Sequence, residues 1–526
     1  MTGDVWVMLP LACLAGGAFA VYLMARLLTA RNDLLALFTA LIFGTALAAM
    51  VPLFALTGKE TGFFPKTRFL LPAWGHFGEG GAFLRADPGA LVVAGVALGL
   101  GLLVTLYSGR YLALDHRYET YYPLLLLLVT GLVGMVLAAD LFNLYMFCEL
   151  MSVAAYVLVA FRRRTAMAIE AGFKYLVMGS VGTVIILLGI SFVYREMGTL
   201  ALPPLSSPPM GGMGVPGPWI RAGVACFLVG LGIKSAVVPL HTWLPDAHGR
   251  APSSISAMLS GIIVQSAFYA LLKVSLGLGF PARDLGTLLI VLSLLNMTLG
   301  NGMALVQTYT KRLLAYSTIA QMGYIMLSIG VGLRYDLPGA IQAGFFLLLA
   351  HAVMKGLAFL CKGVCHFYCD ATRIADLRGT ALRMPLVAVA FSLALAGLAG
   401  VPPLAGFTAK WFILMGALRS RDGLGYVGLA ILLLNSLLAL GYYLPLIGTL
   451  FTPPSSPPMG GKEGGKKGRE SPTEGERGGR IRVSPWMAAP IVALGALVLA
   501  IGLYPGPWLD WTADAGVYLL TVNASR

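Results

Sequence analysis

The stretch LGIKSAVVPLHTWLPDAHGRAP, residues 231–252, decides how this chain folds. It continues an apolar run into Lys234, and an ammonium at membrane depth costs several kcal/mol unless it is paired or hydrated. Pro239 and Pro245 each remove a backbone donor and clash with the preceding turn, so we expect a helix here to break inside the membrane. A lysine beside a broken helix indicates an ion pathway. The alternative is a lysine near a helix end that snorkels to the interface.

Further polar side chains of this stretch are candidates for supporting the break. The carbonyls freed by the prolines need water or polar partners, which His241, Thr242 and Asp246 could supply or help to position. Asp246 is also expected to cap the break or the eighth helix. His241 and His248 are relay candidates as well, because imidazole donates and accepts protons near neutral pH. Either histidine could instead only cap the broken helix.

The composition is that of a polytopic membrane protein. Of 526 residues, 58% are hydrophobic and only 11% are charged, whereas about a quarter of the residues of soluble domains are charged. A spanning helix needs about 20 apolar residues, and the apolar runs divide the chain into roughly 14 spans. Nearly all of the chain therefore lies in the lipid bilayer. The net charge of +14 belongs to arginines in short loops that act as topology signals, so we expect no nucleic-acid partner.

The basic loops predict the orientation of the chain. One set of alternate loops carries most of the arginine and lysine, and the positive-inside rule places that set in the cytoplasm. We therefore expect a multi-pass protein of the cell inner (cytoplasmic) membrane with both termini outside. Since Asp4 stands where a basic n-region would be, no cleavable signal peptide is expected. The basic set comprises Arg26, Arg31, Arg110, Arg117, Arg162–Arg164, Arg250, Lys311, Arg312, Arg373, Arg378, Arg383 and loop 453–484.

Motifs for cofactor chemistry are missing from the sequence. It has no nucleotide-binding glycine loop, no CxxC pair and no convincing Ser/His/Asp order, so we expect no catalytic residue and no cofactor. Cys361, Cys365 and Cys369 repeat every four residues beside His366, which would place their sulfurs on one helix face. A fourth ligand at suitable spacing is missing. We interpret the stripe as packing and expect no metal site.

Instead, the apolar runs hold titratable groups. Glu149 lies well inside a run that ends in arginines, and Lys174 lies near the start of the sixth span. Gln265 is the mid-span polar residue of the eighth span. Intramembrane ionisable residues are functional candidates by default, although Lys174 could simply neutralise the membrane edge.

The twelfth segment, roughly 384–416, repeats the theme of the seventh. Pro402 and Pro403 precede Lys410 in an apolar run, so this helix should also be discontinuous. Two broken helices about five spans apart predict an internal repeat, inverted because five is odd. In the eleventh segment, His351 and Lys355 are one helical turn apart and lie on one face.

Five segments together resemble one protein family. FNLYMFCELMSVAAYVLV, KSAVVPLHTWLPDAHGRAPSSISAMLSG, TKRLLAYSTIAQMGY, HAVMKGLAFL and GVPPLAGFTAKW follow one another over about 130–415. They look like the proton-translocating, antiporter-like membrane subunits shared by respiratory complex I, multisubunit sodium/proton antiporters and membrane-bound hydrogenases. The resemblance implies an all-α polytopic fold of about 14 transmembrane helices. It also implies two inverted five-helix repeats, with the seventh and twelfth helices discontinuous.

The resemblance divides the chain into five parts. They are 1–121 for helices 1–3, 122–280 for the first repeat of helices 4–8, 281–452 for the second, inverted repeat of helices 9–13, 453–484 for a basic loop that is disordered by composition, and 485–526 for the C-terminal helix and tail.

A proton relay is also implied by the resemblance. Glu149 and Lys234 match the family's fifth-helix glutamate and seventh-helix lysine, which form an ion pair. His351 and Lys355 match the eleventh-helix relay, and Lys410 matches the lysine that exchanges protons towards one surface. Since a carboxylate favours the charged form of a buried lysine, separating such a pair would favour release of the proton.

Three features depart from the family pattern. Gln265 cannot titrate, yet it stands where many relatives have lysine or histidine, and Tyr309 stands where they have an acidic residue. Loop 453–484 matches nothing.

From the resemblance we expect a proton-translocating subunit of an NADH:quinone oxidoreductase-like or hydrogenase-like complex, whose partners are other membrane subunits. The alternatives are the D-type component of a multisubunit sodium/proton antiporter, which would also move sodium, and a non-conducting structural paralogue.

Overall fold

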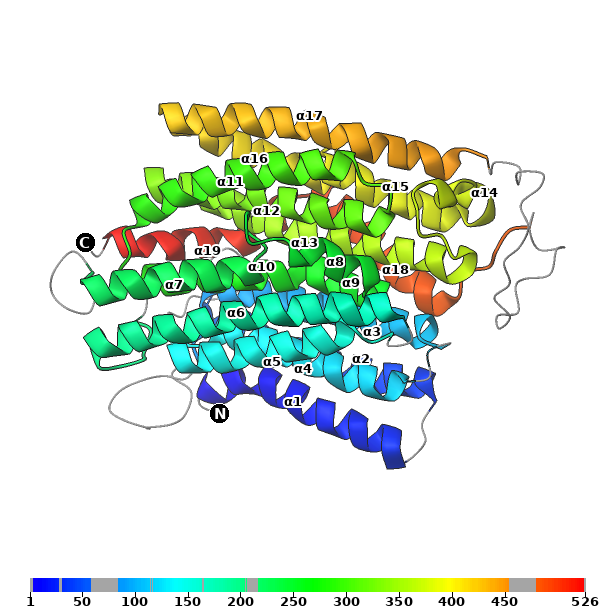
Figure 1. Cartoon of the computed structure of the whole chain (residues 1–526), viewed down its shortest axis with the longest axis horizontal. Coiled ribbons are helices and arrows are strands. Elements are labelled where there is room, and N and C mark those ends of the chain that lie inside the picture. The colour runs from blue at the N-terminus through cyan, green and yellow to red at the C-terminus, as the bar shows by residue number, and fades with distance from the viewer. Residues whose placement is uncertain are drawn as a thin grey trace.

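The chain folds into a bundle of helices that run side by side (Figure 1). The computed structural model describes residues 3–27, 31–57, 84–113, 115, 117–162, 165–203, 205, 216–453 and 479–524. Within these ranges the regular structure is helical, and strand pairing is limited to isolated bridges. The predicted all-α polytopic class is confirmed.

In the described part of the chain, 12 helices are long and apolar enough to cross a membrane. One of them is built from α9 (Ser253–Met258), the π-helical turn η1 (Leu259–Ile263) and α10 (Val264–Gly277). The others are α1 (Gly3–Leu27), α2 (Asn32–Thr57), α3 (Pro88–Tyr111), α4 (Tyr118–Leu137), α5 (Leu141–Val159), α6 (Ala166–Met197), α11 (Ala282–Leu305), α12 (Thr310–Tyr335), α13 (Pro338–Cys369), α17 (Gly423–Phe451) and α18 (Pro485–Leu503).

Two further spans are broken, as the prolines predict. The first consists of α7 (Pro218–Lys234) and α8 (Trp243–Arg250), and the second of α15 (Pro385–Ala399) and α16 (Ala405–Arg419). Together with the 12 continuous spans of the described ranges, the two broken spans give 14, the number that the sequence predicts. The discontinuous seventh and twelfth helices are thus confirmed, whereas the grouping of spans into inverted repeats stays a prediction.

The prolines act differently from one another. Pro239 lies between α7 and α8, and Pro402 and Pro403 lie between α15 and α16. Pro245, which we expected to break a helix, lies in the first turn of α8. The backbone donors of a first turn have no intrahelical partner, so a proline costs little there.

Near the C-terminus the structure departs from the expected tail. Residues after α18 form a further helix, α19 (Gly506–Ala524), which packs against α13 and α3. Of the predicted disordered loop 453–484, residues 454–478 lie outside the described ranges. Two short elements, η2 (Ala375–Leu377) and α14 (Thr380–Arg383), precede the second broken span.

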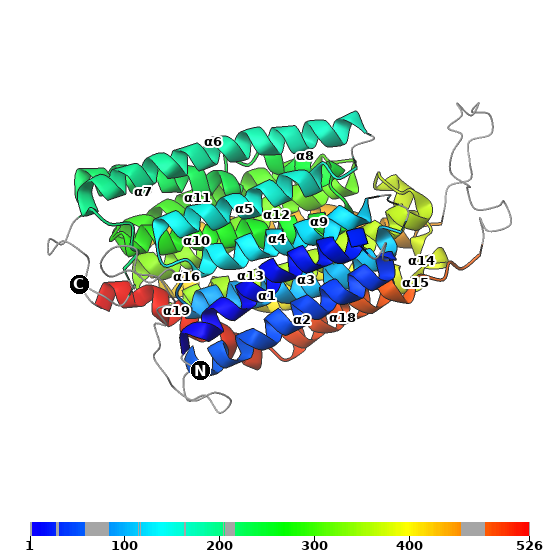
Figure 2. The same ribbon diagram turned by 90° about the horizontal axis from the view of Figure 1, so that it is seen from below.

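The bundle has two distinct ends. At one end, which we call the terminal end, α1 begins and α19 ends (Figures 1 and 2). The opposite end carries α14 and the basic residues Arg110, Arg162, Lys311 and Arg373, and we call it the basic end. Both chain ends therefore lie on the same side of the bundle.

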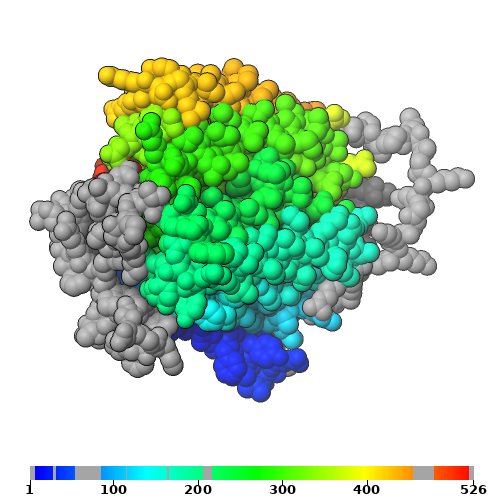
Figure 3. Space-filling view, turned by 60° about the vertical axis from the view of Figure 1, so that its left-hand side comes forward, coloured from blue at the N-terminus to red at the C-terminus, as the bar shows by residue number. Residues whose placement is uncertain are grey.

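Burial differs sharply between the helices. The apolar windows of α13 and of the α9–α10 span are 100% buried, whereas that of α17 is only 28% buried. On the outside, α6 and α17 present large apolar side chains, such as Val184 and Leu437, and Figure 3 shows these helices at the surface. Gln265 on α10 and His351 and Lys355 on α13 are therefore enclosed by protein.

Candidate functional site

The break between α7 and α8 exposes backbone groups that find specific partners. The Val238 amide donates to Asn296 Oδ1 of α11 over 2.8 Å, and Trp243 Nε1 donates to the Ile233 carbonyl over 2.8 Å. Both partners were missed by the sequence analysis. They satisfy groups that a helix interruption leaves without partners in the membrane, so the break is a stable part of the fold.

Lys234 is the last residue of α7 and reaches α5. Its Nζ lies 3.5 Å from Glu149 Oε1 and donates to Ser152 Oγ over 2.7 Å. Thr183 of α6 donates its hydroxyl to the same carboxylate oxygen of Glu149 over 2.5 Å. The Lys234 side chain is 5% exposed and that of Glu149 is 31% exposed. The two predicted partners therefore meet, with the acid nearer the outside of the bundle.

Lys410 lies on α16, beside the second break, and its surroundings are different. Its Nζ donates to the Ala399 carbonyl over 3.0 Å and to the Leu398 carbonyl over 3.4 Å, at the C-terminus of α15. The same Nζ lies 4.8 Å from the centroid of the Tyr324 ring. Gln321 also donates to the Leu398 carbonyl, over 3.0 Å. Among the described residues, Lys410 forms no salt bridge, so carbonyl dipoles and a π face hold this cation.

A cluster of buried polar side chains on α10, α13 and α12 lies between the two broken spans. Gln265 Nε2 is in hydrogen-bonding contact with His351 Nδ1. One turn along α13, Lys355 donates to the Leu314 carbonyl over 2.7 Å and also contacts Ser317 Oγ. Gln265, His351 and Lys355 are all 0% exposed. Gln265, which cannot titrate, is thus the direct neighbour of the predicted relay histidine.

Lys174 and Asp246 lie away from these buried groups. Lys174 is 49% exposed and pairs with Glu170 over 2.8 Å and with Asp246 over 3.2 Å. Asp246 also accepts from Arg312 over 2.8 Å. It therefore links α6, α8 and α12, and its role in capping the break or the eighth span, which begins with α9, stays a prediction. Such exposed pairs contribute little stability.

The two histidines of the broken span occupy different surroundings. His248 of α8 is fully buried, and its ring stacks on Phe359 of α13 with a centroid distance of 5.0 Å. His241 lies in the break itself and is also buried. His248 therefore connects the first broken span to α13, the helix that carries His351 and Lys355.

A second buried ion pair was missed by the sequence analysis. Lys273 of α10 lies 3.1 Å from Asp87, the N-cap residue of α3, and the two side chains are 1% and 0% exposed. The signal that could have found the pair was Lys273 itself, an ammonium within an apolar span.

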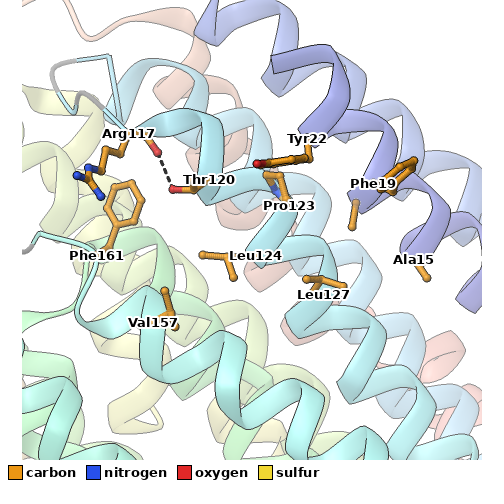
Figure 4. Close-up of a pocket in the computed structure, with 11 residues that line it drawn as sticks. Ala15, Phe19, Tyr22, Arg117, Thr120, Pro123, Leu124, Leu127, Val157 and Phe161 are labelled. Carbon is orange, nitrogen blue, oxygen red and sulfur yellow. Dashed lines mark hydrogen bonds between the residues drawn. The ribbon is translucent and has the colours of Figure 1, made fainter. Parts of the chain in front are cut away.

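One groove lies on the side of the bundle, away from all of these groups. It has a volume of about 490 Å³ and runs between α1, α4 and α5. In Figure 4 Phe19, Leu124 and Val157 line its apolar part, and Arg117 lies at one end. No predicted relay residue lines it. Across the described ranges, no cluster of three or more His, Cys, Asp or Glu side chains could hold a metal ion.

A multi-pass helical bundle with two broken spans, each with a buried lysine beside the break, defines an antiporter-like membrane subunit. Residues 138–437 match the family model described as NADH:quinone oxidoreductase/Mrp antiporter, TM. This match covers more than half of the chain, and the chain belongs to that family.

Similar proteins include subunits of redox complexes. The chain is 33% identical to NADH-quinone oxidoreductase subunit N of Desulforudis audaxviator over 443 residues, which cover 82% of this chain and 83% of the relative. It is 32% identical to F(420)H(2) dehydrogenase subunit N of Methanosarcina mazei over 438 residues, 81% of this chain and 83% of the relative.

Solved structures share the fold over nearly the whole chain. A chain of the archaeal membrane-bound sulfane sulfur reductase superposes with a TM-score of 0.81 at 26% identity, covering 99% of this chain and 98% of the other. A chain of respiratory complex I from Thermus thermophilus gives a TM-score of 0.72 at 26% identity, with coverage of 95% and 98%. For a chain of the Mrp complex from Dietzia sp. the TM-score is 0.80 at 24% identity, with coverage of 99% and 100%.

Proposed function

We propose that this chain is a proton-translocating membrane subunit of a redox-driven multisubunit complex of the NADH:quinone oxidoreductase or hydrogenase type. Protons move through a buried relay of Glu149, Lys234, His351, Lys355 and Lys410. The observation that carries the proposal is the row of buried polar contacts that begins on α5 and α7, continues on α10 and α13, and ends on α12 and α16. Figure 1 shows these helices following one another across the bundle.

In the first part of the relay, Glu149 controls the charge of Lys234. While the carboxylate lies beside the ammonium, the pair is close to neutral and the proton stays on the lysine. When the two groups separate, the buried ammonium loses its counter-ion, and releasing the proton becomes favourable. Ser152 offers Lys234 a second acceptor over 2.7 Å, so a small shift of the lysine tail changes its partner without exposing it to lipid.

In the middle of the relay, Gln265 acts as a hydrogen-bonding partner and His351 as the proton carrier. An imidazole can accept a proton on one nitrogen and donate from the other, and Gln265 fixes the ring by its contact with Nδ1. Lys355 lies one turn along the same helix and can receive the proton. Gln265 itself carries no proton, but because it holds the His351 ring, the proton path stays connected through that histidine.

The basic end is the cytoplasmic end in this proposal. Arginine and lysine concentrate in the loops of that end, which is the bias of cytoplasmic loops in the cell inner membrane. Both termini then lie outside. Labelling of single cysteines introduced at position 3 and position 480 with a membrane-impermeant maleimide should modify only the first from the outside of intact cells.

Proton flux in the intact complex tests the relay. The complex would be purified through a tag on this chain, its co-purifying polypeptides identified, and proteoliposomes energised with its electron donor. Protons moved per electron should fall strongly in Lys234→Ala and Glu149→Gln. Lys174→Ala is the matched control, because Lys174 is exposed, and it should behave as wild type. Equal ratios in all four proteins would overturn the proposal.

A second candidate function is that of a sodium/proton antiporter component, which the similarity of fold to the Mrp chain favours. In that case the co-purifying polypeptides would be small and hydrophobic, and sodium would move against the protons. Sodium-22 uptake that depends on Lys234, without any redox partner, would favour this function over the first. A non-conducting paralogue would show neither flux.

A further inference from the structure

Lys273 and Asp87 form the most completely buried ion pair among the described residues. Lys273 Nζ lies 3.1 Å from Asp87 Oδ2, with side-chain exposures of 1% and 0%. Asp87 Oδ1 accepts from the Ala90 amide over 2.9 Å and also from the Tyr269 hydroxyl. By comparison, Glu149 of the predicted pair is 31% exposed. The pair is thus closed to lipid and held on several sides.

A second cation belongs to the same cluster. Arg85 is 5% exposed, and its Nη1 and Nη2 donate to the Leu202 and Pro203 carbonyls over 2.9 Å and 3.3 Å. Tyr518 of α19 lies beside Arg85 and Asp87. The site therefore combines two basic groups with one carboxylate. Because a guanidinium does not lose its proton in proteins, Lys273 is the group that can relieve the excess positive charge.

The cluster lies at the terminal end of the bundle. Asp87 immediately precedes α3, and Lys273 lies in the last turns of α10, at the end of the bundle where α1 begins (Figure 1). Lys273 Nζ also donates to the Val136 carbonyl of α4 over 2.8 Å. This end is opposite to the basic end, so a group that exchanges protons here faces the other side of the membrane.

One face of α10 connects the cluster to the relay. Gln265, Tyr269 and Lys273 are spaced four residues apart, so they lie on neighbouring turns of one helical face. The first contacts His351, and the second donates to Asp87. Polar groups thus continue along α10 from the middle of the membrane to the terminal end.

We propose that Lys273, with Asp87 and Arg85, is the site at which this chain releases protons at the terminal end. The inference rests on the proposed function. In the step itself, one Nζ–H bond of Lys273 breaks, the proton passes to a water molecule at that end, and the electron pair stays on Nζ. The opposite charges of Asp87 and Arg85 then balance each other within the cluster. Lys273 then takes the next proton through water beside Tyr269, supplied from His351.

Lys273→Arg separates this role from that of a static clamp, meaning an ion pair that only holds α3 and α10 together. An arginine keeps the positive charge and the pair with Asp87 but does not give up its proton. In the reconstituted complex, protons moved per electron should fall about tenfold or more, while the amount of assembled complex and its melting temperature stay as in wild type. Lys174→Arg, the matched control, makes the same exchange at an exposed lysine outside the cluster and should retain the flux.

A clamp predicts the opposite result, because Lys273→Arg, which keeps the charge and the pair with Asp87, would then retain full flux. If Lys273→Arg does not assemble, the double variant Asp87→Asn with Lys273→Met decides, since neutral replacements for a buried pair are often tolerated. Full flux in that double variant would overturn the inference.

Lys234→Ala, measured in parallel, keeps the two proposals apart. Loss of flux in Lys234→Ala together with wild-type flux in Lys273→Arg would overturn the release site alone. Wild-type flux in both variants would overturn the proposed function as well. Loss in both, with Lys174→Arg active, is the expected result.

Discussion

The two broken spans hold their lysines in different ways. Lys234 has a carboxylate 3.5 Å away and a hydroxyl at 2.7 Å, whereas Lys410 has two backbone carbonyls and the face of Tyr324. The first arrangement is close to electrical neutrality, and the second offsets a full charge only with dipoles. Under the proposed function, the first half would store a proton and the second half would pass it on.

The largest effect is expected where the second lysine is removed. Lys410→Leu deletes the proton carrier while keeping an apolar side chain in a buried position, so proton flux per electron should fall about a hundredfold. The reconstituted complex, energised by its donor, provides the measurement. Lys174→Leu removes an exposed lysine and controls for loss of charge. If Lys410→Leu pumps normally, the second half takes no part in transport.

A smaller effect is expected where the two halves meet. Gln265→Leu leaves His351 Nδ1 without its partner, so flux should fall about tenfold. Gln265→His restores a titratable side chain and should retain or raise the flux. The comparison uses initial rates of vesicle acidification at matched protein content. Equal rates for the leucine and histidine variants would mean that protons do not pass this point.

The difference between the surroundings of Lys234 and Lys410 can also be reduced by mutation. Gln321 and Lys410 donate to the same Leu398 carbonyl, so Gln321→Glu places a carboxylate beside Lys410 and makes the second half resemble the first. Because the new carboxylate would hold the proton on Lys410, proton transfer from that lysine should slow about fivefold. Gln321→Leu, which adds no charge, should be milder. A faster Gln321→Glu complex would contradict the proposed division of labour.

The smallest effect is expected from the aromatic face. Tyr324→Leu removes the cation–π contact with Lys410 but leaves both carbonyl acceptors in place, so the flux should change only about twofold to threefold. Tyr324→Phe keeps the ring and serves as control. If the phenylalanine variant is as impaired as the leucine variant, the hydroxyl, not the ring, is what Lys410 requires.

Much of the fold could be predicted because its signals are local. Apolar run length fixes the spans, and Pro239 and Pro402 mark the two breaks in the sequence itself. Pro245 was misread because a proline in the first turn of a helix and a proline that interrupts one look alike in sequence. The α19 helix was missed since its stability comes from packing on α13 and α3, as is usual for a helix of moderate length.

The contacts of the site were harder to predict because they join distant segments. The pairing of Glu149 with Lys234 was expected only through family resemblance. Asn296 reaches Val238 from another span, and Asp87 reaches Lys273 across most of the first half of the chain. Such partners depend on how helices pack, and no pattern within one span encodes them.

The enclosure of α13 has a consequence for how the protein is made. This helix carries His351, Lys355 and Lys362, all fully or nearly fully buried in the finished bundle, yet it leaves the ribosome before α15, α16, α18 and α19, which pack against it. During synthesis, any of its basic residues that face lipid on the sides still uncovered do so at considerable energetic cost. The newly made chain must keep α13 against the earlier helices, or outside the bilayer, until its last four neighbours arrive.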